Sequence, residues 1–277
     1  MTRPDPQSLE ELEIDLLLEG LFRQYGFDFR GYARSSLRRR VRAVVASEQL
    51  ATVSALQDRM LHDAGALQRL LLGLSVNVSS MFRDPRFFLA FRRKAIPFLR
   101  TYPFIRIWQA GCSTGEEVYS LAILLQEEGL YDRCRIYATD MNETVLQTAR
   151  EGIYQLDLMQ KYTVNYLAAG GLSSFSEYYT AAYDHVIFRP SLRERVVFSQ
   201  HNLASDGPFN EFNVILCRNV MIYFGRPLQD RVHDLFSRSL ATFGLLGLGS
   251  HESLRFGPTE RQYEAVEPGE KLFRRVH

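Results

Sequence analysis

The chain has 277 residues, 46% of them hydrophobic, and its 33 Lys and Arg residues nearly balance its 32 Asp and Glu residues. A chain of this length can bury a large core, as one big domain or as one large and one small domain. Because the net charge is close to zero, any surface for nucleic acid or for an anionic membrane must be local. The three Cys and six His residues show neither CxxC nor HxxxH spacing, so we expect no disulfide framework and no metal site.

The N-terminal region predicts a small helical domain. Acidic residues stand where a signal peptide needs a basic start, and no stretch approaches about 20 continuous apolar residues, so we expect a cytoplasmic protein without membrane insertion. Residues 8–74 carry helical signals from the capping-box pattern Ser8-Leu9-Glu10-Glu11 onward, and they show no convincing strand. We therefore predict an all-helical domain over 1–74, followed by a linker over 75–85 that contributes to a ligand site.

A basic run lies within this helical domain. The stretch FRGYARSSLRRRVRAVVAS (29–47) contains six Arg residues and no acidic residue. If it is helical, Arg34, Arg38 and Arg42 share an arc of roughly 80° beside an apolar face. Most such runs are solvated faces. Docking of an acidic protein, of nucleic acid or of a nucleotide regulator is the competing interpretation.

Strand and helix patterns alternate in the second domain, which we predict over 86–277. Such alternation favours a doubly wound, Rossmann-like α/β sheet, and Glu267-Pro268-Gly269 predicts an antiparallel hairpin that closes it. The interval 153–194 breaks the rhythm and predicts a small β insertion, with a β subdomain at about 171–198. The expected elements are strand 104–111, helix 116–129, strand 134–140, helix 143–150, strands 195–203 and 212–220, a helix from Gly225, and a strand-like run at 243–254.

The turn Gly111-Cys112-Ser113-Thr114-Gly115 follows the first of these strands. In open α/β sheets, ligands bind beyond the carboxyl ends of the strands, and a carboxylate that ends the next strand, here Asp140, can accept hydrogen bonds from ribose hydroxyls. The GxxxG pattern alone is as compatible with an ordinary tight turn. The turn and Asp140 together indicate a nucleoside site. We interpret Cys112 as a small loop residue rather than a nucleophile.

Glu116 and Glu117 begin the helix after this turn. They can interact favourably with the helix dipole and cap the helix N-terminus, or one of them can face a cationic ligand. Two carboxylates would repel phosphate, whereas they suit a nucleoside that carries positive charge. S-adenosylmethionine, with its sulfonium and ammonium groups, is therefore the leading candidate.

Five ordered blocks resemble the CheR family of chemotaxis receptor methyltransferases, from about residue 20 to the C-terminus. The resemblance implies an S-adenosylmethionine methyltransferase fold and an enzyme that methylates glutamate side chains of receptor signalling helices, with S-adenosylhomocysteine as product. The blocks are NVSSMFRDPRFF, IWQAGCSTGEEVYSLA, YATDMNETVLQTAREGIY, FSQHNL and FNVILCRNVMIYF.

The resemblance also implies the site residues. Family members commonly have Thr at Ser79, Ala at Gly111 and Pro at Val118, and we expect these differences to be tolerated. We place the ligand-facing carboxylate on Glu117, with Glu116 as the alternative left open. The implied cofactor site comprises Asn77, Ser79, Arg83, Gly111, Glu117, Asp140, Asn202, Leu203, Arg218 and Asn219.

Arg83 and Tyr223 are the implied catalytic residues. A guanidinium can hold the substrate carboxylate in a fork, and a phenol can add a directional hydrogen bond. Without the resemblance, a surface salt bridge for Arg83 and a core aromatic role for Tyr223 would be preferred. No general base is expected, because a glutamate is already ionised near neutral pH.

The expected partner is the cytoplasmic, glutamate-rich signalling helix of a chemoreceptor or a similar protein, docked on Arg34, Arg38 and Arg42. We expect a monomer that binds no nucleic acid. Two rival functions stay open: a cofactor-binding regulatory adaptor with little activity, and a methyltransferase for a small molecule or nucleic acid. Whether residues 171–194 bind a receptor's C-terminal tether peptide is also open.

Overall fold

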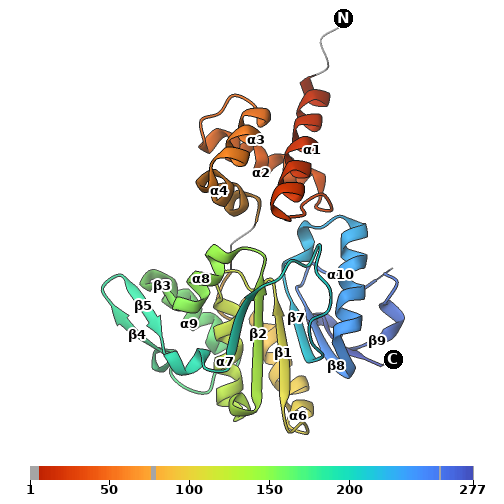
Figure 1. The fold of residues 1–277 in the computed structure, drawn as a ribbon. Coiled ribbons are helices and arrows are strands. Elements are labelled where there is room, and N and C mark those ends of the chain that lie inside the picture. Colours follow the sequence, from red (N-terminus) through yellow and green to blue (C-terminus); the bar gives the residue numbers. More distant parts are fainter. Residues whose placement is uncertain (1–5, 76–78, 256, 277) are drawn as a thin grey trace, which may run out of the picture. The chain divides into compact units, whose positions relative to one another are not determined.

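The computed structural model describes residues 6–75, 79–255 and 257–276 (Figure 1). The chain forms two compact units. One comprises Met1–Val76 together with Tyr223–Arg231, and the other comprises Asn77–Ile222 with Val232–His277. The first unit thus includes a short segment from the second half of the chain, which contains Tyr223.

The first unit is helical, as predicted. Side-chain caps set two of its helix starts: Thr52 Oγ1 accepts from the N–H of Ala55 at 3.1 Å, and Asp63 Oδ1 accepts from the N–H of Gly65 at 2.8 Å. Apolar residues at helical spacing fill its core, including Leu17, Leu21, Leu37, Val41, Leu56, Met60, Leu70 and Leu74. Its helices are α1 (Pro6–Tyr25), α2 (Arg34–Ser47), α3 (Val53–His62) and α4 (Ala64–Leu74).

The second unit contains a seven-stranded mixed sheet in the order β6-β2-β1-β7-β8-β10-β9. The first five strands in this order are parallel, and β10 and β9 are antiparallel to their neighbours. The predicted parallel sheet with a closing hairpin is therefore confirmed, with the turn at Pro268–Glu270. The strands are β1 (Ile105–Ala110), β2 (Cys134–Asp140), β6 (Val196–Gln200), β7 (Phe212–Cys217), β8 (Leu240–Leu248), β9 (Tyr263–Glu267) and β10 (Leu272–Arg275).

Both faces of the sheet are buried, as a parallel sheet requires. Successive strand residues point to opposite faces, so Ile107 of β1 joins the core that includes residues of α7, while the fully buried Trp108 packs at 5.4 Å against Phe236 of α10. The helical segments of this unit are α5 (Pro85–Ala90), a π-helical turn (Phe91–Ala95), α6 (Ile96–Leu99), α7 (Glu116–Glu127), α8 (Glu143–Glu151) and α9 (Met159–Ala168), and α10 (Arg226–Ser239) begins in the first unit.

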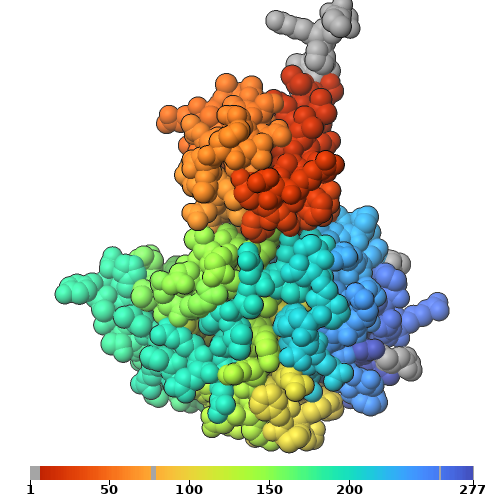
Figure 2. All heavy atoms as spheres, in the orientation of Figure 1, coloured from red at the N-terminus to blue at the C-terminus, as the bar shows by residue number. Residues whose placement is uncertain are grey.

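A separate antiparallel sheet forms the predicted β insertion. Its strands β3 (Ile153–Gln155), β4 (Tyr179–Ala182) and β5 (His185–Phe188) pair in the order β3-β5-β4. The subdomain is predicted to start at about residue 171, but its first strand, β3, lies earlier in the chain, at 153–155. Helix α9 lies between β3 and β4 in the sequence. Tyr154 and Phe188 bury this sheet against the core of the second unit, and its outer part projects from the surface (Figure 2).

Among the described helices, none has the length and apolar character that a membrane span requires.

Candidate active site

The glycine turn after β1 lies where the sequence predicts a ligand site. Gly111 and Gly115 have φ values of 71° and 93°, a region that favours glycine. A Cβ on Gly111 would lie 2.5 Å from Val220 Cγ2, and one on Gly115 would lie 2.8 Å from Ala149 Cβ. Both glycines are therefore needed because the loop after β7 and helix α8 press against the turn.

Asp140 at the end of β2 closes this turn. Its Oδ2 accepts the N–H of Ser113 at 2.9 Å, and its Oδ1 accepts the N–H of Asn142 at 3.0 Å. Burial raises the pKa of Asp140, while these backbone donors oppose the rise. The N–H of Met141 also hydrogen-bonds to this carboxylate, so three backbone donors leave one of its roughly four acceptor sites open. Among the described residues, the buried Ser113 Oγ and Asn142 Nδ2 have no hydrogen-bond partner. This set of donors and acceptors fits the hydroxyls of a ribose.

The two glutamates at the start of α7 have different surroundings, although both are buried. Glu117 is compensated: its Oε2 lies 2.6 Å from Nη1 of Arg218, and its Oε1 accepts from Gln109 Nε2 at 2.9 Å. Its predicted role as the cofactor-facing residue therefore competes with an ion pair, and it stays a prediction.

Glu116 has hydroxyl partners instead. Its Oε2 accepts from Thr114 Oγ1 at 2.7 Å, and Ser79 also hydrogen-bonds to it. Burial raises the pKa of Glu116, which these hydroxyls partly oppose. No Lys or Arg of the described chain forms an ion pair with it, so a cationic ligand could compensate this carboxylate.

Arg218, which follows β7 directly, connects three parts of the second unit. Besides Glu117, its guanidinium contacts the turn before α5: Nη2 donates to Asp84 Oδ2 at 2.9 Å and to the backbone oxygen of Arg83 at 3.1 Å. It also lies 4.2 Å from the ring centroid of Phe87. Its side chain thus fixes the position of the Arg83 backbone.

The two predicted catalytic residues belong to different units. Arg83 is half-buried in the second unit. Tyr223 belongs to the first, where its backbone oxygen accepts the N–H of Ala33 at 2.8 Å and its ring lies 4.5 Å from the guanidinium of Arg40. That Arg83 and Tyr223 meet at one substrate stays a prediction.

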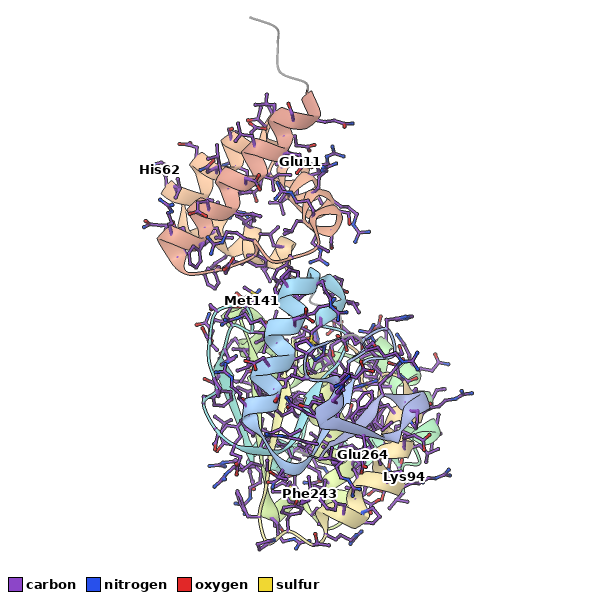
Figure 3. All side chains as sticks on the ribbon, turned by 90° about the vertical axis from the view of Figure 1, so that its right-hand side faces the viewer. Glu11, His62, Lys94, Met141, Phe243 and Glu264 are labelled. Atoms are coloured by element: carbon purple, nitrogen blue, oxygen red, sulfur yellow. The ribbon has the colours of Figure 1, made fainter. Side chains whose placement is uncertain are left out.

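The remaining predicted cofactor residues follow the ends of β6 and β7. The N–H of His201 donates to the backbone oxygen of Asp140 at 3.0 Å, which places Asn202 and the buried Leu203 beside the end of β2. Asn219 follows Arg218 with a left-handed φ of 61°. The strand ends thus bring Gly111, Asp140, Asn202 and Asn219 to one edge of the sheet. Figure 3 labels Met141, which follows Asp140. The predicted cofactor residue Asn77 lies outside the described residues.

The predicted docking arginines of α2 are paired with acidic residues of α1. Arg34 lies 2.7 Å from Glu11 and 2.6 Å from Asp15, and Arg38 also pairs with Glu11 (labelled in Figure 3). Glu10 forms a two-pronged pair with Arg42 at 2.6 Å. Their charges are therefore compensated within the helical unit, and their docking role stays a prediction.

Sequence reasoning missed two buried charged residues, Arg40 of the first unit and Glu252 of the second. Arg40 lies at helical spacing from Leu37 and Val44, so its place on the apolar face of α2 was a signal that it is buried. Glu252 carries no such signal, because it acts on backbone N–H groups that only the folded chain brings to it.

No group of three or more His, Cys, Asp or Glu side chains in the described part of the chain is placed to hold a metal ion.

This sheet order, with a glycine turn after β1 and a carboxylate at the end of β2, defines the class of Rossmann-like nucleoside-binding proteins. Two family descriptions match the chain: the all-alpha domain of CheR methyltransferases over residues 12–75, and their SAM binding domain over residues 77–269. The chain belongs to the CheR methyltransferase family.

Relatives cover most of the chain. A Pseudomonas putida protein with the provisional name methyltransferase Cher3 is 49% identical over 96% of this chain and 97% of its own length. A chemotaxis protein methyltransferase of Listeria monocytogenes is 29% identical over 84% of this chain and 86% of its own. One from Salmonella typhimurium is 32% identical over 67% of this chain and 64% of its own.

Proposed function

We propose that this methyltransferase transfers the methyl group of S-adenosylmethionine to glutamate side chains of a chemotaxis receptor or a related signalling protein. The observation that carries the proposal is the acidic glycine turn, where the buried carboxylate of Glu116 has hydroxyl partners but no ion pair among the described residues and so suits a cationic nucleoside. The relatives named chemotaxis protein methyltransferases support the choice of acceptor.

The cofactor, when bound, supplies a methyl group on a positively charged sulfur. Asp140 would accept a hydrogen bond from a ribose hydroxyl, since its three backbone donors leave the carboxylate one of roughly four acceptor sites. Glu116 or Glu117 would face the cationic part, with Glu116 as the carboxylate that lacks an ion-pair partner in the described chain. Asn202, Leu203 and Asn219 would complete the site from the neighbouring strand ends.

The acceptor carboxylate needs no general base, because glutamate has a reference pKa of about 4.3. Arg83 would hold this carboxylate through its guanidinium fork, and Tyr223 would add a hydrogen bond from its hydroxyl. The carboxylate oxygen forms its bond to the methyl carbon as the sulfur–carbon bond breaks, and no proton has to move. Positioning and removal of water from the carboxylate are then the main tasks of the protein.

The glutamate-rich helix of the substrate would dock on Arg34, Arg38 and Arg42. The pairs of these residues with α1 mean that docking has to compete with Glu10, Glu11 and Asp15. The exposed Arg39 on the same helix offers a further cation.

A transfer assay with methyl-labelled cofactor and receptor cytoplasmic domains tests this function. A protein-glutamate methyltransferase leaves label on the receptor that alkali releases as methanol. Cofactor binding without label transfer would instead identify the regulatory adaptor, and alkali-stable label would identify a different acceptor.

A further inference from the structure

Glu252 is a buried carboxylate to which the methyl transfer assigns no role. It follows β8 in the sequence SHESL, and its residue is 4% exposed. Its Oε1 accepts the N–H groups of Val220 and Met221, each at 2.8 Å. Its Oε2 accepts the N–H groups of Asn219 at 3.0 Å and Gly249 at 2.6 Å.

Three of these donors are consecutive in the loop after β7. Successive backbone N–H groups that converge in this way form a nest for an anion, and the left-handed conformation of Asn219, with φ of 61°, is typical of such a turn. Here the anion is the chain's own carboxylate. Only an acceptor suits all four N–H groups, so an amide in place of the carboxylate would turn an N–H₂ donor toward other donors.

The loop after β7, which Glu252 binds through its N–H groups, also packs against the glycine turn at residues 111–115. Val220 packs so closely on Gly111 that a Cβ there would lie 2.5 Å from its Cγ2. Gly249 is equally confined, because a Cβ on it would lie 2.7 Å from both the Asn219 nitrogen and Glu252 Oε2. One carboxylate thus joins the loop after β8 to the loop after β7, and the latter packs on the turn after β1.

We propose that Glu252 is a positioning residue for the cofactor site: it shapes residues 219–221 so that Val220 supports the Gly111 turn and Asn219 faces the ligand. The inference rests on the proposed site, in which Asn219 contacts the cofactor. Glu252 itself acts only through backbone N–H groups of this loop and of Gly249, and all four hydrogen bonds lie within the second unit.

The test compares Glu252→Gln with Glu127→Gln in the full chain. Glu127 is the control, because its side chain is also only 4% exposed and lies in the same unit, away from the glycine turn. It pairs with Arg92 and accepts hydrogen bonds from Tyr166, Tyr178 and the N–H of Leu172. Both variants should lower the melting temperature. Only Glu252→Gln should weaken S-adenosylmethionine binding, by about tenfold or more, measured by calorimetry and by the fluorescence of Trp108, the single Trp of the chain.

Amide hydrogen exchange without cofactor gives an independent result. The N–H groups of residues 219–221 should be protected in the wild type and exchange faster in Glu252→Gln, while Glu127→Gln leaves them unchanged. If Glu252→Gln does not fold, Glu252→Asp is the second variant, because it keeps the negative charge on a shorter side chain. It should fold and bind S-adenosylmethionine more weakly than the wild type does, but still measurably.

Equal cofactor affinity of the wild type and a folded Glu252 variant, or rapid exchange of 219–221 in the wild type, would overturn the inference. Neither measurement involves the methyl acceptor. If the protein binds cofactor but methylates no glutamate, the proposed function fails while the role of Glu252 still stands.

Discussion

Glu116 and Glu117 are neighbours in sequence, yet their carboxylates have different electrostatic roles. Glu117 balances Arg218, which is itself buried, whereas Glu116 has only hydroxyl partners among the described side chains. Removing one member of a buried ion pair leaves the charge of the other less well compensated, and this costs more than removing a carboxylate that burial already disfavours.

We therefore expect opposite consequences of two substitutions. Glu117→Gln should lower the free energy of unfolding by about 3 kcal/mol, because among the described residues Arg218 then keeps Asp84 alone as an anionic partner. Glu116→Gln should leave stability nearly unchanged and weaken cofactor binding. Thermal unfolding and calorimetric titration measure the two effects. A Glu116→Gln variant that binds the cofactor normally would return the ligand-facing role to Glu117.

Arg83→Ala should reduce turnover by about a hundredfold or more while the fold stays intact, because the guanidinium would hold the substrate carboxylate during transfer. Arg218 binds the backbone oxygen of Arg83 rather than its side chain, so this contact survives the substitution. The nearby exposed Arg86 provides the control, and Arg86→Ala should methylate normally. Near-normal methylation by Arg83→Ala would remove Arg83 from the mechanism.

At the scale of elements, the acidic side of α1 occupies the arginines of α2. Glu11 pairs with both Arg34 and Arg38. If these arginines dock a glutamate-rich helix, Glu11→Gln should remove the ion pair of Arg38 and leave Arg34 paired with Asp15. It should then lower KM for the receptor several-fold at low salt, with less effect at high salt. Glu19→Gln, on the same helix but paired with Arg23 and Arg30, should not change KM. An unchanged KM in Glu11→Gln would make the arginines a purely structural face.

A second set of ion pairs joins the helices of this unit. Glu48, after α2, pairs with Arg59 at 3.0 Å and Arg69 at 2.5 Å, and hydrogen bonds from Arg69 first and then Arg59 lower the pKa of Glu48 from 4.5 to about 2. A carboxyl group with a lowered pKa in the folded state stabilises that state above its unfolded pKa. This stabilisation is lost as the pH falls from 4.5 toward about 2.

The stability difference between the wild type and Glu48→Gln should therefore be constant above about pH 5 and shrink toward pH 2. Urea unfolding of the full chain, followed by helical circular dichroism at several pH values, measures it. A difference that does not change over this range would show that the pairs of Glu48 contribute no pH-dependent stability.

At the scale of the whole molecule, local sequence patterns predicted the helical unit, the parallel sheet and the closing hairpin, because periodicity and turn residues act over short distances. The sequence did not predict the roles of Glu252 and Arg40, nor the partners of the α2 arginines. These depend on side chains that meet groups distant in the chain, such as Glu11, 23 residues from Arg34, and the Leu74 oxygen, 34 residues from Arg40, or on backbone N–H groups that no residue type reveals. Ordered sequence motifs predicted the candidate site residues, whereas the structure was needed to identify the side chains and backbone groups that contact them.

The central claim is that the methyl group goes to glutamate, and mass spectrometry of the receptor tests it most directly. Receptor cytoplasmic domains are incubated with enzyme and S-adenosylmethionine, digested and sequenced by fragmentation, with Arg83→Ala as the inactive control. We predict that specific glutamate side chains gain one methyl group, which alkali removes, and that the control leaves them unmodified. Receptors without modified glutamates, after incubation with enzyme that binds the cofactor, would contradict the claim.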